Sequence, residues 1–146
     1  MKDKTLKMNE LVDFPEGLDE KHVIKHFGGL SRLEATRMIA EENPFPFTVY
    51  TEDLMWMSDA GFTYYFPAYV AACKIVCNQK GKEYVENLCA GILTAIAFRA
   101  EEFPGCIINN KEIVVEFISF LEKEAEEMIS YSVYNKKLLE IYKLLE

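Results

Sequence analysis

Apolar residues recur every three or four positions over most of the second half of the chain, which is the spacing of one face of an α-helix. Residues 82–100 show this pattern most clearly, and residues 110–128 repeat it with charged residues on the other faces. A third segment of this kind follows Asn135, and Pro104 and Gly105 separate the first two. The pattern predicts three helices that share a core. The expected core positions are Tyr84, Val85, Leu88, Cys89, Ile92, Leu93 and Ile96 in the first helix and Val114, Phe117, Ile118, Leu121, Ala125 and Met128 in the second.

The beginning of the chain predicts shorter elements. Residues 1–17 have no strong period, which predicts an irregular segment. A short helix is expected over residues 18–27, where two glycines end it. A second helix is expected from Ser31, which opens an S-x-x-E capping box, to about Glu42.

Prolines and cap residues divide the middle of the chain. Residues 43–47 contain two prolines, which end the preceding helix, and a connector that is briefly strand-like is expected to continue to Thr51. Thr51 and Ser58 are each expected to cap a helical turn. Pro67 lies inside an apolar run that ends near Asn78, so this helix is expected to kink or to begin anew at the proline.

Length and composition fit one domain. A chain of 146 residues is long enough for one hydrophobic core and too short for two. No internal repeat or linker divides it. We therefore expect an all-α fold, an irregular bundle of about six to seven helices in a single domain over residues 1–146.

Charge and hydropathy disfavour several kinds of partner. The chain has 16 basic and 24 acidic residues, a net charge of −8 and a pI near 4.9. Because no basic patch is segregated, nucleic-acid binding is disfavoured. No apolar run approaches the roughly 20 residues of a membrane span and no secretory signal is recognisable, so we expect a cytoplasmic protein with no membrane contact. Its four cysteines are then expected to be reduced and buried.

The chemistry-bearing residues do not form a known catalytic motif. His22 and His26, the only histidines, lie at i, i+4 spacing, and Cys73 and Cys77 repeat that spacing, so a shared zinc site can be drawn. We favour the alternative, in which the histidines lie at the surface and the thiols pack in the core. We therefore expect no metal and no cofactor. The sequence contains no nucleophile elbow and no glycine-rich phosphate loop. Its adjacent acidic pairs are typical of solvated helix ends.

The segment between Arg37 and Lys74 differs from the rest of the chain. It contains no basic residue, five acidic residues and nine of the nineteen aromatic residues. Unpaired negative charge speeds encounter with a basic protein and aromatic rings stabilise interfaces, so this combination favours a protein-recognition surface. Part of the aromatic set is expected to fill the core instead, namely Phe62, Tyr65, Phe66 and Tyr69. The residues expected to bind a partner are Glu41, Glu42, Tyr50, Glu52, Asp53, Trp56 and Asp59.

Residues 62–70, with the sequence FTYYFPAYV, resemble the signature F-R-Y-Y-L-P-A-Y-L of a family of small bacterial proteins of unknown function. Thr63 stands where that family usually has arginine, so an ion-pair role of that arginine does not carry over. The resemblance implies a bacterial origin and a helical fold, and it implies no activity. The matching positions are Phe62, Tyr64, Tyr65, Pro67, Ala68 and Tyr69.

A non-catalytic, acidic protein-binding protein is the function that these observations favour. Its sharpest form is an immunity-type protein, which would neutralise a bacterial toxin by occluding a basic active site. Two alternatives stay open. One is a homo-oligomeric structural or regulatory module, such as a homodimer, that pairs through residues 110–146. The other is an enzyme whose site is assembled from scattered acids, tyrosines and a histidine.

Overall fold

The computed structural model describes residues 5–42 and 49–146, and its fold is all-α, as predicted. Ten helices are present in the described ranges, against the six to seven expected. The difference arises from three short helices, α1, α7 and α9, of four, six and five residues. The helices are α1 (Met8–Leu11), α2 (Leu18–Phe27), α3 (Arg32–Glu41), α4 (Val49–Trp56), α5 (Asp59–Gln79), α6 (Lys82–Glu102), α7 (Pro104–Asn109), α8 (Lys111–Glu124), α9 (Glu126–Ser130) and α10 (Ser132–Leu145).

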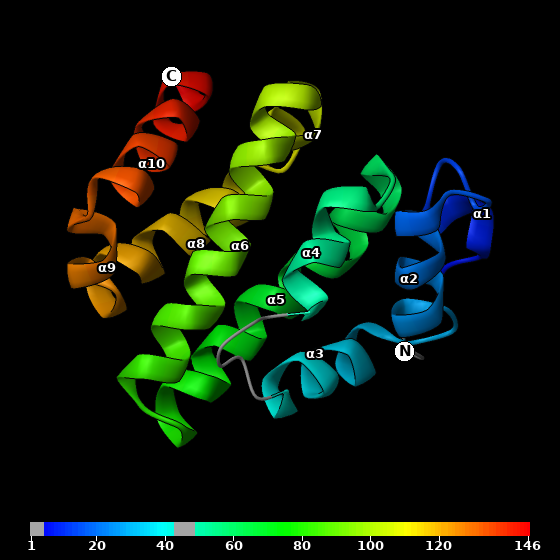
Figure 1. The fold of residues 1–146 in the computed structure, drawn as a ribbon, viewed down its shortest axis with the longest axis horizontal. Helices are drawn as coiled ribbons and strands as arrows, with labels where there is room; N and C mark the ends of the chain where they lie inside the picture. Colours follow the sequence, from blue (N-terminus) through cyan, green and yellow to red (C-terminus); the bar gives the residue numbers. More distant parts are fainter. Residues whose placement is uncertain (1–4, 43–48) are drawn as a thin grey trace.

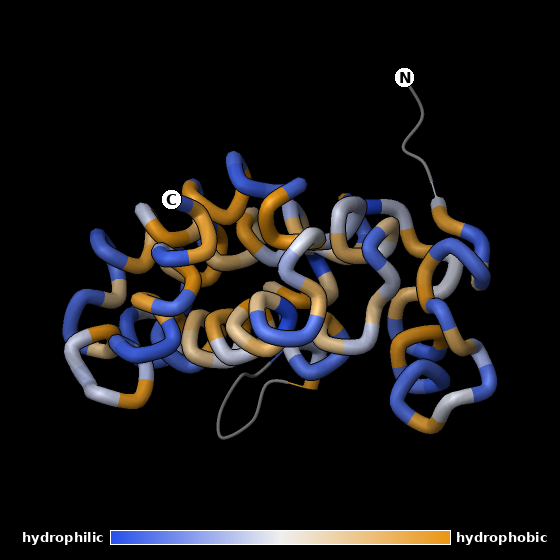
Figure 2. Tube along the Cα trace, turned by 90° about the horizontal axis from the view of Figure 1, so that it is seen from above, coloured by the Kyte–Doolittle hydropathy of each residue, from blue (hydrophilic) through white to orange (hydrophobic). Residues whose placement is uncertain are grey.

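The two longest helices, α5 and α6, run through the middle of the bundle, with α1 to α3 on one side and α8 to α10 on the other (Figure 1). α3 packs on α5, α10 packs on α6, and α4 contacts both α2 and α6. Apolar and polar positions alternate along the peripheral helices (Figure 2), and the buried apolar residues form one core cluster. Within the described ranges, no helix has the length and apolarity that a membrane crossing requires.

Several predicted elements are confirmed. α2 spans the expected residues, and α3 begins with the expected capping box, in which the Ser31 hydroxyl accepts from the Glu34 amide and the Glu34 carboxylate accepts from the Ser31 amide. Ser58 caps α5, and its hydroxyl accepts from the Gly61 amide at 2.9 Å. In α6 the predicted core stripe is buried, apart from the half-buried Tyr84.

The middle of the chain differs from the expectation. The two prolines of the expected connector fall outside the described residues, and from Val49 onward the chain is helical, so the strand-like prediction is wrong for residues 49–51. Thr51 is a buried residue inside α4 and not its cap. The Glu42 carboxylate takes the capping role, because its Oε1 accepts from the Val49 amide at 2.7 Å.

Two predicted helices also differ from the expectation farther along the chain. α5 is continuous through Pro67, so the helix does not begin anew there. The long amphipathic helix expected to reach Met128 is interrupted at Ala125, where α8 ends. Asn110 precedes α8 but caps no helical amide, because its side chain donates to Thr63 Oγ1 and to the Cys106 carbonyl.

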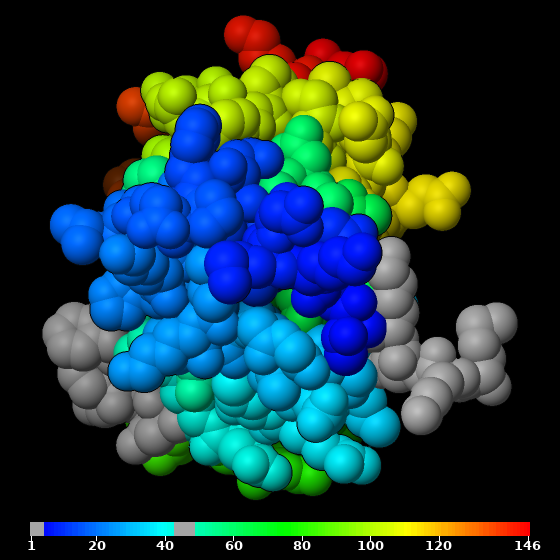
Figure 3. All heavy atoms as spheres, turned by 90° about the vertical axis from the view of Figure 1, so that its right-hand side faces the viewer, coloured from blue at the N-terminus to red at the C-terminus, as the bar shows by residue number. Residues whose placement is uncertain are grey.

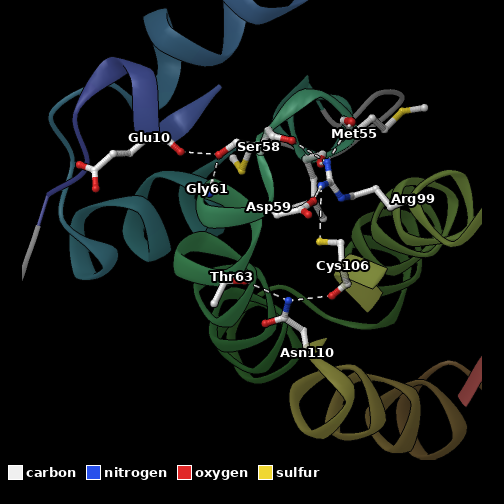
Figure 4. A network of polar contacts seen from close by, with 11 residues as sticks. Glu10, Met55, Ser58, Asp59, Gly61, Thr63, Arg99, Cys106 and Asn110 are labelled. Atoms are coloured by element: carbon white, nitrogen blue, oxygen red, sulfur yellow. Dashed lines mark hydrogen bonds and ion pairs between the residues drawn. The ribbon is translucent and has the colours of Figure 1, made fainter. Parts of the chain in front are cut away.

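The N-terminal segment, expected to be irregular, contains the single-turn helix α1 and is fixed to the start of α5. The Leu11 carbonyl accepts from the Ser58 amide at 2.8 Å, and the Ser58 hydroxyl donates to the Glu10 carbonyl (Figure 4). Leu11 and Val12 are fully buried. A Cβ at Gly61 would lie 2.5 Å from the Leu11 carbonyl oxygen, so the absence of a side chain there lets the two segments approach.

The aromatic core prediction is confirmed, since all four of the expected rings are completely buried. Two of them also connect helices through their hydroxyl groups. Tyr65 donates to the carbonyls of Phe27 and Leu30, at 3.1 and 2.6 Å, and Tyr69 donates to the carbonyl of Tyr50. α5 therefore fixes both the end of α2 and the first turn of α4.

A buried arginine fixes the other end of α4. Arg99 of α6 is only 1% exposed, and its Nη1 donates to three carbonyl oxygens where α4 ends, those of Leu54, Met55 and Met57, at 3.4, 3.2 and 2.7 Å (Figure 4). The last carbonyls of a helix have no partner within it, and a cation there also opposes the negative end of the helix dipole. α4 is thus held by a carboxylate at its first residue and a guanidinium at its last turn.

Candidate functional site

A cleft of about 230 Å³ separates α2 from α4, and we call it the α2–α4 cleft. The lining residues of α2 are three or four positions apart, and those of α4 recur one turn apart as Val49, the neighbours Glu52 and Asp53, and Trp56, so each helix contributes one face to it. Figure 3 looks at the side of the molecule that α1 to α3 cover, with α2 in blue. The lining residues are Asp19, His22 and His26 from α2 and Val49, Glu52, Asp53 and Trp56 from α4.

His26 and Asp53 form a close pair across this cleft. The distance from His26 Nδ1 to Asp53 Oδ2 is 2.5 Å, and the Asp53 side chain is only 5% exposed. The imidazole also meets the edge of the Tyr50 ring, with 5.1 Å between ring centroids. Burial raises the pKa of Asp53 to about 6, although the hydrogen bond and charge of His26 oppose the rise. At neutral pH the carboxylate is therefore ionised and Nδ1 donates to it.

Asp53 is expected to make the protein less stable as the pH rises from about 4 to about 6. Its pKa is about 6 in the folded chain against 3.8 for the free side chain, so in this range the folded state holds a proton that the unfolded state has released. Relative to Asp53→Asn, which can still accept from Nδ1, the wild type should lose about 2–3 kcal/mol of unfolding free energy by pH 7. Urea titrations of both proteins at pH 4 to 7 measure this loss, and parallel pH curves would contradict the prediction.

A second depression of about 490 Å³ lies between α3 and the start of α4, and we call it the α3–α4 hollow. Both depressions are lined in part by the first turn of α4, where Val49 faces the cleft and Tyr50 faces the hollow. Burial raises the pKa of Glu42, while the amides of Val49 and Tyr50 lower it. The residues that line the α3–α4 hollow are Glu34, Arg37, Met38, Glu41, Glu42 and Tyr50.

Six of the seven residues predicted to bind a partner line these two depressions, three in each. Their exposure differs strongly. Two carboxylates are open to solvent, two aromatic side chains and one carboxylate are half-buried, and Asp53 is buried. The six are Glu52, Asp53 and Trp56 in the cleft and Glu41, Glu42 and Tyr50 in the hollow.

The seventh residue, Asp59, lines neither depression. Its carboxylate is 69% exposed and accepts from Arg99 Nη2 at 2.9 Å (Figure 4). The negative charge of Asp59 is therefore balanced by the buried guanidinium. The pairing with Arg99 accounts for an acidic residue at position 59, and no partner protein has to be invoked for it.

Sequence reasoning missed the contribution of α2 to this site. The sequence predicts for His26 a zinc ligand, a surface residue or a member of a scattered enzyme site, and it predicts no role for Asp19. The useful signal was the spacing of Val49, Asp53 and Trp56, which share one face only if residues 49–56 are helical. The strand-like prediction for the start of this segment concealed that face.

The described lining of the cleft offers a base and lacks the other groups that acyl transfer needs. A histidine oriented by a buried aspartate is the arrangement of a general base. Acyl transfer also needs a nucleophile and donors for developing negative charge, and the described residues of the lining include no serine, threonine, cysteine, lysine or arginine. The carboxylates of Asp19 and Glu52 would instead repel an oxyanion.

The thiols offer no alternative nucleophile. Burial raises the pKa of Cys77, and it raises that of Cys106 to about 11. The pKa of Cys89 is raised well above its usual value by its hydrogen bond to Cys73 and by burial. Thiols that stay protonated at neutral pH react slowly. Among the residues that the structure describes, no group of three or more candidate ligands could hold a metal ion.

No protein-family model matches the chain, and neither a curated protein nor a solved structure matches it. The resemblance of residues 62–70 to a bacterial signature therefore stays a prediction. In the structure Tyr64, Tyr65 and Tyr69 of this segment are all buried in α5. The segment thus contributes to packing, and the candidate site lies on other helices.

Proposed function

We propose that this chain is a non-catalytic binding protein that uses the α2–α4 cleft and the α3–α4 hollow to bind a basic surface of a partner protein. The observation that best supports the proposal is the lining of the cleft, where Asp19, Glu52 and Asp53 lie with the indole of Trp56 and no described lining residue is a lysine or arginine. Among the described residues that line the hollow, only Arg37 is basic.

Each part of this surface has a role in the proposed interaction. Glu41 and Glu52 are exposed, so their charges act on an approaching partner through solvent and mainly accelerate association. Trp56 and Tyr50 are half-buried rings in fixed positions, which is typical of residues that contribute most of the affinity of an interface. In the immunity-type form of the proposal, this surface covers the basic active site of a bacterial toxin.

Charge reversal tests the proposal. We expect Glu41→Lys/Glu52→Lys to weaken binding of the natural partner about 10- to 100-fold at low salt, mainly through slower association. The partner is identified by mass spectrometry after co-purification from the source cells and is then titrated in purified form by calorimetry. The control is Glu112→Lys/Glu140→Lys, the same charge change at exposed acids of α8 and α10. Equal affinities of the two double variants would contradict the proposal.

The homo-oligomeric alternative is favoured by one observation, the exposed apolar side chains of the last helix. Val133 and Leu139 of α10 are 55% and 59% exposed. Exposed apolar side chains of this size lose unfavourable contact with water when a second molecule covers them. Light scattering at several protein concentrations distinguishes the two functions, because a monomer at all concentrations contradicts the homo-oligomeric alternative.

A further inference from the structure

We propose that the α2–α4 cleft is a receptor for one arginine side chain of the partner. This inference rests on the proposed function and specifies the group that the cleft recognises. It follows from the charge of the cleft, its aromatic wall and its enclosure between two helices.

The cleft carries negative charge that the described part of the chain leaves unbalanced. Asp19 of α2 and Glu52 of α4 line it from opposite helices, and both are exposed. Neither forms an ion pair with a described residue, whereas Glu116 and Glu127 are paired with Lys74 and Lys82. A cation placed between the two carboxylates would reduce their mutual repulsion.

The interior of the cleft also favours a cation over an anion. Asp53 is buried between the helices and is ionised at neutral pH. The Nδ1–H of His26 is already donated to this carboxylate, so it is not available to an anionic ligand. A phosphate or carboxylate in the cleft would therefore face three carboxylates, against the one histidine ring of His22 on the same lining.

Trp56 gives the cleft an aromatic wall. A cation over an indole face is stabilised by the ring quadrupole, and more strongly where water is partly excluded. The indole Nε1–H is buried and has no acceptor among the described residues, although buried donors usually have one. An arginine residue of a partner brings a guanidinium that suits both the carboxylates and the face of an aromatic ring.

Arginine fits this environment better than lysine does. Its planar guanidinium stacks on rings, binds carboxylates in a forked geometry and loses its hydration more readily than an ammonium group. Two arginine residues of this chain already place their guanidinium groups next to aromatic rings. Arg99 pairs with Asp59 while its Cζ lies 5.0 Å from the centroid of the Phe62 ring, and Arg32 Cζ lies 4.5 Å from that of Tyr64.

Trp56 is the only tryptophan of the chain, so its fluorescence reports directly on the cleft. The probe is Nα-acetyl-arginine methylamide, titrated at constant ionic strength. We expect a saturable change in emission with a dissociation constant on the order of 1 mM. Nα-acetyl-citrulline methylamide, which has nearly the same shape and no charge, should bind at least about tenfold more weakly, and Nα-acetyl-lysine methylamide should fall between them.

Matched variants locate the binding. Glu52→Gln and Asp19→Asn should each weaken arginine binding about two- to fivefold, and the control Glu112→Gln on α8 should leave it unchanged. The inference is overturned if citrulline binds as tightly as arginine, if lysine binds more tightly, or if Glu52→Gln behaves like the control.

The outcomes also separate this inference from the proposed function. If arginine leaves the Trp56 emission unchanged while Glu41→Lys/Glu52→Lys still weakens partner binding, the arginine receptor is overturned and the proposed function stands. If arginine binds with the expected preferences while partner binding is indifferent to charge reversal, the cleft is a guanidinium site and the proposed function is overturned.

Discussion

Arg99→Met is expected to lower the free energy of unfolding by about 3–5 kcal/mol. The methionine can fill much of the apolar space, but it donates no hydrogen bond. Three carbonyl oxygens at the end of α4 and the Asp59 carboxylate would lose a donor, and at least two of those oxygens belong to buried residues. The change should also loosen α4, because Arg99 holds its last turn.

Urea denaturation followed by circular dichroism measures this loss. The matched control is Arg37→Met, the same substitution at an exposed site of α3, which should change the unfolding free energy by no more than about 0.5 kcal/mol. Arg99→Lys should lie between the two, since an ammonium group keeps the charge but not the forked geometry. Equal stabilities of the Arg99 and Arg37 variants would show that the carbonyl contacts contribute little.

Phe27→Ala is expected to cost about 3–5 kcal/mol through the cavity that it leaves. Phe27 is the last residue of α2 and is completely buried. Its ring lies among three tyrosines, with centroid distances of 6.1 Å to Tyr50, 5.0 Å to Tyr65 and 5.9 Å to Tyr69. The substitution therefore removes the packing that joins α2, α4 and α5 beneath the candidate site.

The control for this substitution is Phe14→Ala, because that ring is 70% exposed and should contribute almost nothing to stability. Phe27→Leu should cost clearly less than Phe27→Ala, since it keeps most of the buried volume. Calorimetric melting of the three variants gives the comparison. A Phe27→Ala melting temperature close to that of Phe14→Ala would contradict the expected role of the ring.

The helices that bury one continuous stripe could be predicted from the sequence. In α6 the three-and-four spacing of apolar residues follows from core packing, and the structure buries that stripe almost completely. α4 could not be predicted in this way, because it is held by distant groups. Glu42 meets its first amide from seven positions earlier, and Arg99 reaches its last turn from more than forty positions later.

The sequence indicated which segment carries the acidic residues of the candidate site, but it did not indicate which residues contact one another there. The excess of acidic and aromatic residues identified Glu52 and Trp56, which both line the cleft. The pairing of His26 with Asp53 joins residues 27 positions apart on separate helices, and periodicity carries no information about such a contact. For Asp59 the charge alone was misleading. The sequence grouped this acid with the partner-binding residues, whereas in the structure its carboxylate pairs with Arg99 of the same chain.

The attachment of α1 to the start of α5 determines how far the chain can be shortened. Deleting residues 5–12 would remove Leu11 and Val12 from the interior and leave the Ser58 amide without its acceptor. Proteolytic removal of this segment would therefore lower the stability of the whole helical bundle. Shortened versions made for crystallisation or for binding assays therefore need to retain Leu11 and Val12 and the turn that precedes them.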